Sequence, residues 1–169
     1  MSETMEKLLT RRSIRRIGTC RDKLERIIEA GTYAATAMNK QSPIIIAVTN
    51  KAVRDQLSAM NAKVMGADTD PFYGAPVVLV VLADKTNPNC VYDGSLVMGN
   101  LMLAAHDEGL GSCWIHRAKQ EFETPEGREL LARLGIEGEY EGIGHCIIGY
   151  AAEEPEAKPR KENYVYWVE

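Results

Sequence analysis

The feature that most constrains this chain is the continuous apolar run at residues 77–82, which follows Ala75 and Pro76. An apolar run of this length is typical of a strand buried on both faces. Three further apolar or β-branched runs predict strands at residues 44–48, 112–116 and 142–150. These four strands are separated by segments long enough to hold helices.

Helices are predicted before and between the strands. Residues 2–9 form a short helix, and Asp22 with Glu25 has the spacing of an N-cap and its capping-box partner. The helix that follows has an apolar face made up of Leu24, Ile27, Ile28 and Gly31. A third helix has an apolar face made up of Val53, Leu57, Met60 and Val64. The last predicted helix begins with an N-cap and a first-turn proline, Thr124 and Pro125, and its apolar face holds Leu130, Leu131 and Leu134.

Residues 93–108 predict a helix that is apolar almost all round, and Gly109 ends it. Such a helix is normally buried, either in the core of its own chain or at a subunit interface.

The mixed order of helices and strands restricts the fold class. No Gly-rich fingerprint follows any predicted strand, so the chain is not a Rossmann domain. A layered α+β sheet is the class that fits. A length of 169 residues suits one domain, residues 1–169, of which about 152–169 form a charged tail that contains proline.

The charge balance gives no footprint for nucleic acid or for an anionic membrane, because the net charge is -4, with 20 basic and 24 acidic side chains. No segment approaches the roughly 18 apolar residues of a membrane span, and the N-terminus lacks the apolar core of a secretory signal. The four cysteines, Cys20, Cys90, Cys113 and Cys146, form no CxxC pair and no metal-binding spacing. We therefore expect reduced thiols in a cytoplasmic protein without a metal site.

Two basic clusters lie at opposite ends of the chain. The first surrounds Ser13 and holds Arg11, Arg12, Arg15 and Arg16; the second holds Lys158, Arg160 and Lys161. Each cluster can be a solvated run of charge. Alternatively, both ends assemble one phosphate site, since Arg forks bind phosphate oxygens and Ser adds a hydroxyl donor.

Four segments in a fixed order carry a family resemblance: RRSIR at 11–15, EAGTYAATAMNKQSP at 29–43, GLGSCWI at 109–115 and IGYAAEEPEAKPRK at 148–161. With these segments the chain resembles the nitroreductase family of flavoproteins over nearly its whole length. The resemblance implies a mostly antiparallel central sheet flanked by helices. It also implies an intertwined homodimer with FMN sites at the subunit interface.

The resemblance further implies an activity. Hydride would pass from NADH or NADPH through flavin N5 to a small acceptor, such as a nitroaromatic or a quinone, by a ping-pong mechanism. No side chain would be catalytic, because the flavin performs the chemistry. A non-catalytic protein that stores or senses FMN is the alternative.

By position in the motifs, the resemblance assigns cofactor-binding roles. Arg11 and Ser13 would hold the phosphate and ribityl end of FMN with Lys158 and Arg160, and Arg12 would contact the same region. Arg15 would approach the pyrimidine edge of the ring. The ring would be bordered by Trp114, Ile115 and His116, and its polar edge would be bound by Asn39 and Gln41 of the other subunit. His116 has an alternative role as a solvated or packing residue, whereas His106 and His145 are interpreted as structural.

Some features of the chain depart from the family pattern. The usual Ala-Pro-Ser is Ala35-Thr36-Ala37, and the usual Pro-Trp after Gln41 is Ser42-Pro43. The chain also lacks the long insertions of larger members, which implies an open pocket. The apolar end of the tail, residues 164–168, would wrap onto the partner subunit or fold back on its own.

Overall fold

The apolar run at the centre of the sequence forms the central strand of the fold. In the computed structural model, which describes residues 2–15 and 23–169, β2 (Val77–Asp84) is buried from Val77 to Ala83. It pairs on one side with β1 (Pro43–Val48) and on the other with β4 (Tyr140–Gly149). The predicted N-cap Asp22, together with Arg16 and Cys20, lies outside the described residues.

All pairings in this four-stranded sheet are antiparallel, and the strand order is β1-β2-β4-β3. The short strand β3 (Gly111–Ile115) is therefore an edge strand. The register shifts by one residue between Val81 and Leu82, so that Ile143 of β4 bulges between Gly142 and Gly144. The α+β class and the antiparallel sheet implied by the resemblance are confirmed.

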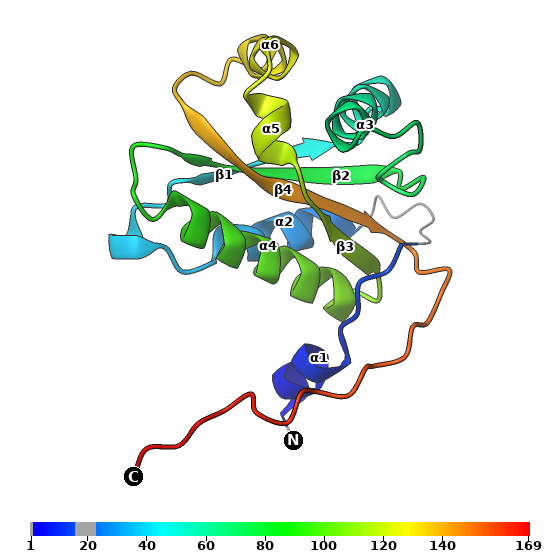
Figure 1. Ribbon diagram of the computed structural model, residues 1–169, viewed down its shortest axis with the longest axis vertical. Helices are drawn as coiled ribbons and strands as arrows, with labels where there is room; N and C mark the ends of the chain where they lie inside the picture. Colours follow the sequence, from blue (N-terminus) through cyan, green and yellow to red (C-terminus); the bar gives the residue numbers. More distant parts are fainter. Residues whose placement is uncertain (1, 16–22) are drawn as a thin grey trace.

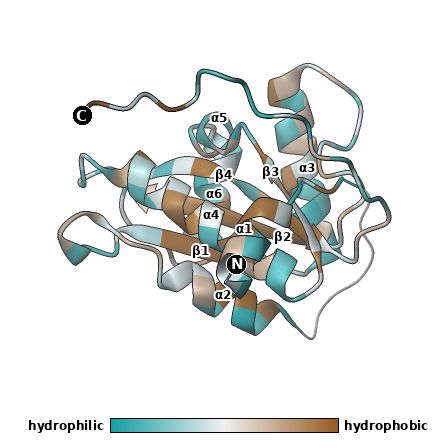
Figure 2. Ribbon diagram, turned by 90° about the horizontal axis from the view of Figure 1, so that it is seen from below, coloured by the Kyte–Doolittle hydropathy of each residue, from teal (hydrophilic) through white to brown (hydrophobic). Residues whose placement is uncertain are grey.

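Helices cover both faces of the sheet (Figure 1). On one face lie α2 (Leu24–Thr32) and α4 (Cys90–Asp107), and on the other lie α3 (Lys51–Met65), α5 (Ala118–Phe122) and α6 (Pro125–Arg133). Successive residues of β2 point to opposite faces. Leu79 and Val81 thus join the core under α4, whereas Val78 and Val80 join the core under α3. Figure 2 shows the hydrophobic residues gathered in the strands and in the helices that pack on them.

The two ends of the chain leave the sheet. Helix α1 (Glu3–Thr10) buries no residue and contacts the end of α4, where Thr10 Oγ1 lies 2.8 Å from His106 Nε2. The C-terminal tail leaves the end of β4 and ends away from the sheet (Figure 1). Its last aromatic residue, Trp167, is 85% exposed within the single chain.

Three local features differ from the sequence-based predictions. Helix α4 begins at Cys90 rather than Asp93, and the buried Asp93 carboxylate in its first turn accepts from Ala37 N–H and the Asn87 side chain. Helix α4 is also not buried all round within the chain, since Leu96 is 52% exposed. Leu134, predicted on the buried face of α6, is half-exposed at the C-cap.

Three further expectations concern membrane spans, cysteines and metal sites. Within the described residues, no helix is both long and apolar enough to cross a bilayer. The described cysteines, Cys90, Cys113 and Cys146, are buried free thiols. The described residues also hold no group of three His, Cys, Asp or Glu side chains placed to bind a metal ion.

Candidate functional site

The first and third motifs meet at the edge strand. Ser13 forms a parallel bridge with Ser112, and Ile14 N–H donates to the Ser112 carbonyl over 2.8 Å. Gly111 allows this approach, because a Cβ there would lie 2.6 Å from Ile14 Cγ2. Segments about 100 residues apart in the sequence are thereby placed side by side, which local sequence patterns alone do not predict.

A pocket of about 530 Å³ lies next to this contact and is called the β3 pocket below. Its volume is within the usual range for small-molecule sites, about 300–1,000 Å³. The N-terminal segment contributes Arg15, and β3 with the turn after it contributes Cys113, Trp114, Ile115, His116 and Arg117. The opposite wall comes from the end of α3 and the loop before β2, with Met65, Thr69, Asp70, Pro71 and Tyr73.

Trp114 and Ile115 border this pocket from opposite faces of β3. The Trp114 indole packs over Gly144, where a Cβ would lie 2.2 Å from Nε1, and it contacts the core under α4. Ile115 is only 6% exposed and joins the core under α3. Because their side chains alternate, no more than one of the two can lie flat against the same face of a bound ring.

The turn after β3 is held by a buried polar network that the sequence did not reveal. Asn61 of α3 donates from Nδ2 to the His116 carbonyl over 2.8 Å, and Arg117 Nε donates to Asn61 Oδ1 over 2.8 Å. Asn61 Nδ2 also donates to Glu121, whose other oxygen lies 3.2 Å from His145 Nε2. Asn61, Glu121 and His145 are all 0% exposed. These contacts fix the backbone at the rim of the β3 pocket.

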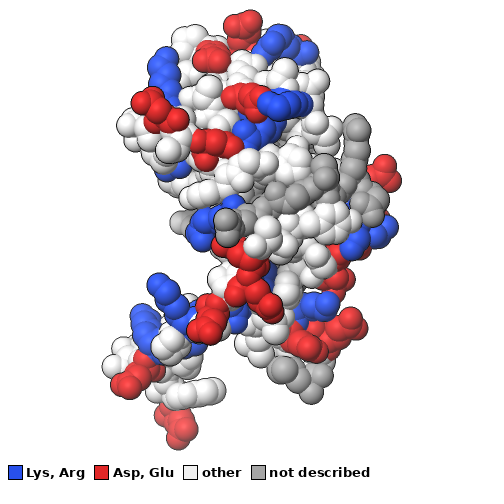
Figure 3. All heavy atoms as spheres, turned by 90° about the vertical axis from the view of Figure 1, so that its right-hand side faces the viewer, with Lys and Arg blue, Asp and Glu red and all other residues white. Residues whose placement is uncertain are grey.

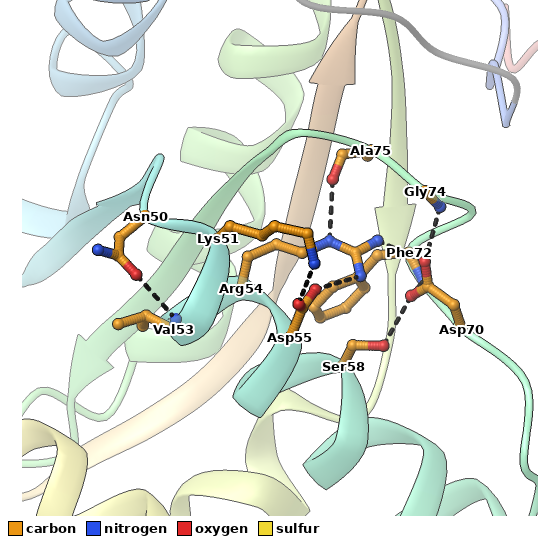
Figure 4. A network of polar contacts seen from close by, with 10 residues as sticks. All are labelled: Asn50, Lys51, Val53, Arg54, Asp55, Ser58, Asp70, Phe72, Gly74 and Ala75. Atoms are coloured by element: carbon orange, nitrogen blue, oxygen red, sulfur yellow. Dashed lines mark hydrogen bonds and ion pairs between the residues drawn. The ribbon is translucent and has the colours of Figure 1, made fainter.

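The opposite wall is anchored by an ion pair (Figure 4). Arg54 of α3, 8% exposed, donates to Asp70 Oδ2 over 2.5 Å and to the Ala75 carbonyl over 2.9 Å. Asp70 also accepts from Ser58 Oγ, Phe72 N–H and Gly74 N–H, at 2.6–2.9 Å. The loop at 66–76 is thus tied to α3 by one carboxylate with four donors.

The Asp70 anchor predicts a loss of stability in acid. Burial raises the pKa of the Asp70 carboxyl, but the donors Arg54, Ser58, Gly74 and Phe72 outweigh this effect and lower it to about 2. A lowered pKa stabilises the fold above the unfolded value of 3.8, and this contribution is lost as pH falls through 2. Because Asp70 is 34% exposed, we expect only about 1 kcal/mol. Asp70→Asn should therefore make the free energy of unfolding less dependent on pH between pH 4 and 2. An unchanged pH dependence would contradict the anchor. Asp68→Asn, at an exposed residue of the same loop, is the control.

The basic residues around Ser13 have different surroundings. Arg11 has a buried guanidinium nitrogen, Nη1, that has no hydrogen-bond partner in the chain. Arg12 Nη1, in contrast, donates to the Leu9 and Arg11 carbonyls, both at 2.8 Å. An unpartnered charged donor that is buried is costly, and this is the surrounding expected where an anion would be bound.

The C-terminal tail approaches the segment around Ser13 through the acidic residue Glu153 rather than through its basic residues. Arg15 N–H donates to Glu153 Oε1 over 2.7 Å, and a hollow of about 770 Å³ lies between Arg12, His106 and Pro155. Lys158 and Arg160 are exposed, and Arg160 donates to the Lys158 carbonyl. Within the described chain, neither residue has a hydrogen bond or ion pair to Arg11, Arg12 or Ser13. One chain alone thus does not join the two basic clusters.

Asn39 and Gln41 lie at the opposite end of the sheet. They precede Pro43, which pairs with Ala83 near the end of β2, and Gln41 Nε2 donates to Asn39 Oδ1 over 3.2 Å. The loop has left-handed backbone at Met38, Asn39 and Gln41, with φ of 53°, 52° and 50°. Neither Asn39 nor Gln41 lines the β3 pocket of its own chain.

The surface charge around these elements is mixed. On the face shown in Figure 3, Lys and Arg alternate with Asp and Glu, and no field of one sign covers the body of the molecule. Any anion selectivity must therefore come from local groups such as Arg11 and Arg15, as the net charge of -4 also indicates.

Residues 64–150 match the Nitroreductase family. The chain belongs to the nitroreductase family. The matched region covers the loop before β2, the whole of α4, β3 and β4, and every residue of the β3 pocket except Arg15. The family predicted from the four motifs is confirmed.

Solved nitroreductase structures share the whole fold. A nitroreductase with bound FMN from Bacteroides fragilis NCTC 9343 is 25% identical, with a TM-score of 0.89 and full coverage of both chains. An FMN-dependent nitroreductase from Clostridium difficile R20291 is 26% identical over 96% of this chain and 98% of that one, with a TM-score of 0.79. A nitroreductase with bound FMN from Desulfitobacterium hafniense DCB-2, 24% identical over the full length of both chains, has the same fold with a TM-score of 0.88.

Proposed function

We propose that this nitroreductase-family chain binds FMN at the β3 pocket and transfers hydride from NADH or NADPH to a small acceptor. The observation that carries the proposal is the Ser13–Ser112 bridge, which places Arg15 in the same pocket as Trp114 and His116. Two relatives at 25–26% identity, described as binding or depending on FMN, support the choice of cofactor.

The residues present fit the cofactor. The unpartnered Nη1 of Arg11 offers a buried donor to a phosphate oxygen, and Ser13 lies two residues away with its hydroxyl. Lys158 and Arg160 would complete the phosphate site, and Arg12 would support it. Trp114, Ile115 and His116 would border the ring, while Asn39 and Gln41 of the partner subunit would bind its polar edge.

When bound, FMN supplies the hydride chemistry at its N5 atom. The chain's own groups bind and tune it. The Arg15 guanidinium would stabilise negative charge at the pyrimidine edge and so raise the reduction potential. The buried walls around Ile115 and Cys113 exclude water from that side of the pocket. Reductant and acceptor would use the same open side in turn, which gives ping-pong kinetics.

A homodimer is part of this proposal. The exposed face of α4 presents Val91, Tyr92 and Leu96, and the tail presents Tyr164 to Val168; an apolar surface of this kind is unusual in a monomer. Asn39 and Gln41 do not line the β3 pocket of their own chain, so their proposed role requires a partner subunit. Light scattering of the purified protein tests this part, and a monomer that retains FMN would contradict it.

The experiment for the whole proposal is optical. We expect purified protein to show the absorbance of oxidised flavin, and anaerobic mixing with NADH or NADPH to bleach it. Arg15→Ala should lower FMN content or the midpoint potential, whereas Arg133→Ala, on the exposed side of α6, should change neither. Bound flavin that neither coenzyme bleaches would favour a storage or sensing protein. Equal FMN content and potential in Arg15→Ala would contradict the role of Arg15.

A further inference from the structure

Tyr73, in the wall of the β3 pocket, has an unusual backbone conformation. Its φ is 52°, in the left-handed region, and its side chain is 50% exposed. Bulky side chains rarely adopt this conformation, which favours Gly, Asn or Asp. A strained residue of this kind persists where the surrounding structure fixes it, and such residues concentrate at ligand sites.

The surroundings that fix Tyr73 are the anchored residues on either side of it (Figure 4). Phe72 is fully buried, with its ring 5.5 Å from Arg54 Cζ and 5.0 Å from the His145 ring. The Phe72 and Gly74 N–H groups both donate to the Asp70 carboxylate, and Tyr73 N–H donates to the Asp70 carbonyl over 3.1 Å. The backbone is thereby held before and after Tyr73, which is one of the residues that line the pocket.

The turn by itself does not require an aromatic residue. Asn or Gly would form the same left-handed turn with less strain. A tyrosine at this position is explained if its ring contributes to the pocket. Trp114 and His116 line the same pocket, so a flat ligand bound there would lie among aromatic residues from two parts of the chain.

We propose that Tyr73 is a specificity-determining residue whose ring stacks against flat, electron-poor aromatic acceptors in the β3 pocket. This rests on the proposed function, because it assumes that electrons leave the protein at this pocket. The phenol ring is electron-rich, and offset stacking on an electron-poor ring, such as that of a nitroaromatic or a quinone, is favourable. Acceptors without an aromatic plane would gain nothing from Tyr73.

The test compares variants of Tyr73 with two kinds of acceptor in the FMN-loaded protein. Tyr73→Asn removes the ring and tolerates the left-handed backbone, whereas Tyr73→Phe keeps the ring as the matched control. For a naphthoquinone or a nitrobenzene derivative, we expect Tyr73→Asn to raise KM roughly five- to tenfold and Tyr73→Phe to change it less than about twofold. For ferricyanide, an octahedral anion that cannot stack, both variants should match the wild type.

The possible outcomes separate this inference from the function on which it rests. FMN content and Tm are measured for each variant. If Tyr73→Asn lowers the Tm, Tyr73→Gly is used instead, because glycine removes the ring and adopts the left-handed turn without steric strain. An unchanged KM for the aromatic acceptors, an equal change for ferricyanide, or a fall in FMN content would overturn the role of Tyr73. A wild-type protein that holds no FMN, or whose FMN is not bleached by NADH or NADPH, would instead overturn the proposed function together with this inference.

Discussion

Gly142→Ala is expected to destabilise the fold severely, because no space exists for a methyl group at this position. A Cβ there would lie 2.3 Å from the carbonyl carbon of Ala118, 2.4 Å from its oxygen and 2.5 Å from Lys119 N. These are backbone atoms of α5, which packs directly on β4, so no side-chain rotation can relieve the overlap. We expect a loss of at least about 3 kcal/mol in the free energy of unfolding, and a fall in Tm of roughly 6–12 °C.

The measurement is thermal unfolding followed by circular dichroism, with Glu139→Ala as the matched control. Glu139 lies three residues away, is exposed, and contributes its backbone carbonyl rather than its side chain to a bond with Lys85 N–H. Its replacement should leave the Tm within about 2 °C of wild type, as for most surface substitutions. A Gly142→Ala protein with the Tm of the control would show that α5 does not lie against β4 as described.

The sheet and its helices were predictable because their signals are local. The apolar run at 77–82, the stripe of Leu57 and Met60, and the cap formed by Thr124 and Pro125 each act within a few residues. The structure places β2, α3 and α6 at these segments, and Thr124 Oγ1 accepts from Gly127 N–H as an N-cap does. Periodicity and capping therefore determined the type and order of the long elements.

Helix α5 was not predicted, because what holds it is not local. It is five residues long and has no N-cap side chain, and Arg117 before it has a left-handed backbone with φ of 82°. Its position depends on Gly142, 24 residues from Ala118, and on the Glu121 side chain buried beside His145. A helix this short is marginal without such tertiary contacts.

The two sides of the candidate site also differ in how far local sequence patterns predict them. Arg15, Trp114 and His116 were named from motifs, and the structure brings them to one pocket. The opposite wall, with Tyr73 and its Arg54–Asp70 anchor, comes from a segment whose Gly, Asp and Pro content indicates a loop but not what the loop packs against. For Asn39, Gln41, Lys158 and Arg160, which one chain does not bring to the pocket, the cofactor roles remain predictions that depend on the proposed homodimer.

Glu121→Ala should be the other most damaging substitution, because it removes the shared partner of two buried polar groups. Glu121 accepts from Asn61 Nδ2 and lies 3.2 Å from His145 Nε2, and all three residues are 0% exposed. Loss of the carboxylate removes the Glu121 oxygen that lies next to the buried His145 ring and leaves a cavity in its place. Removing one member of such a buried pair typically costs about 3–5 kcal/mol, which corresponds to a fall in Tm of roughly 6–20 °C in a chain of this size.

A double-mutant cycle separates the pair from the cavity. Glu121→Leu and His145→Leu should each destabilise the protein in urea unfolding, because each leaves one buried atom of the other side chain, His145 Nε2 or Glu121 Oε2, without its polar neighbour. The double variant has neither polar group, so its loss of unfolding free energy should fall short of the sum of the two single losses by at least about 1 kcal/mol. Strictly additive losses would show that the two side chains do not interact.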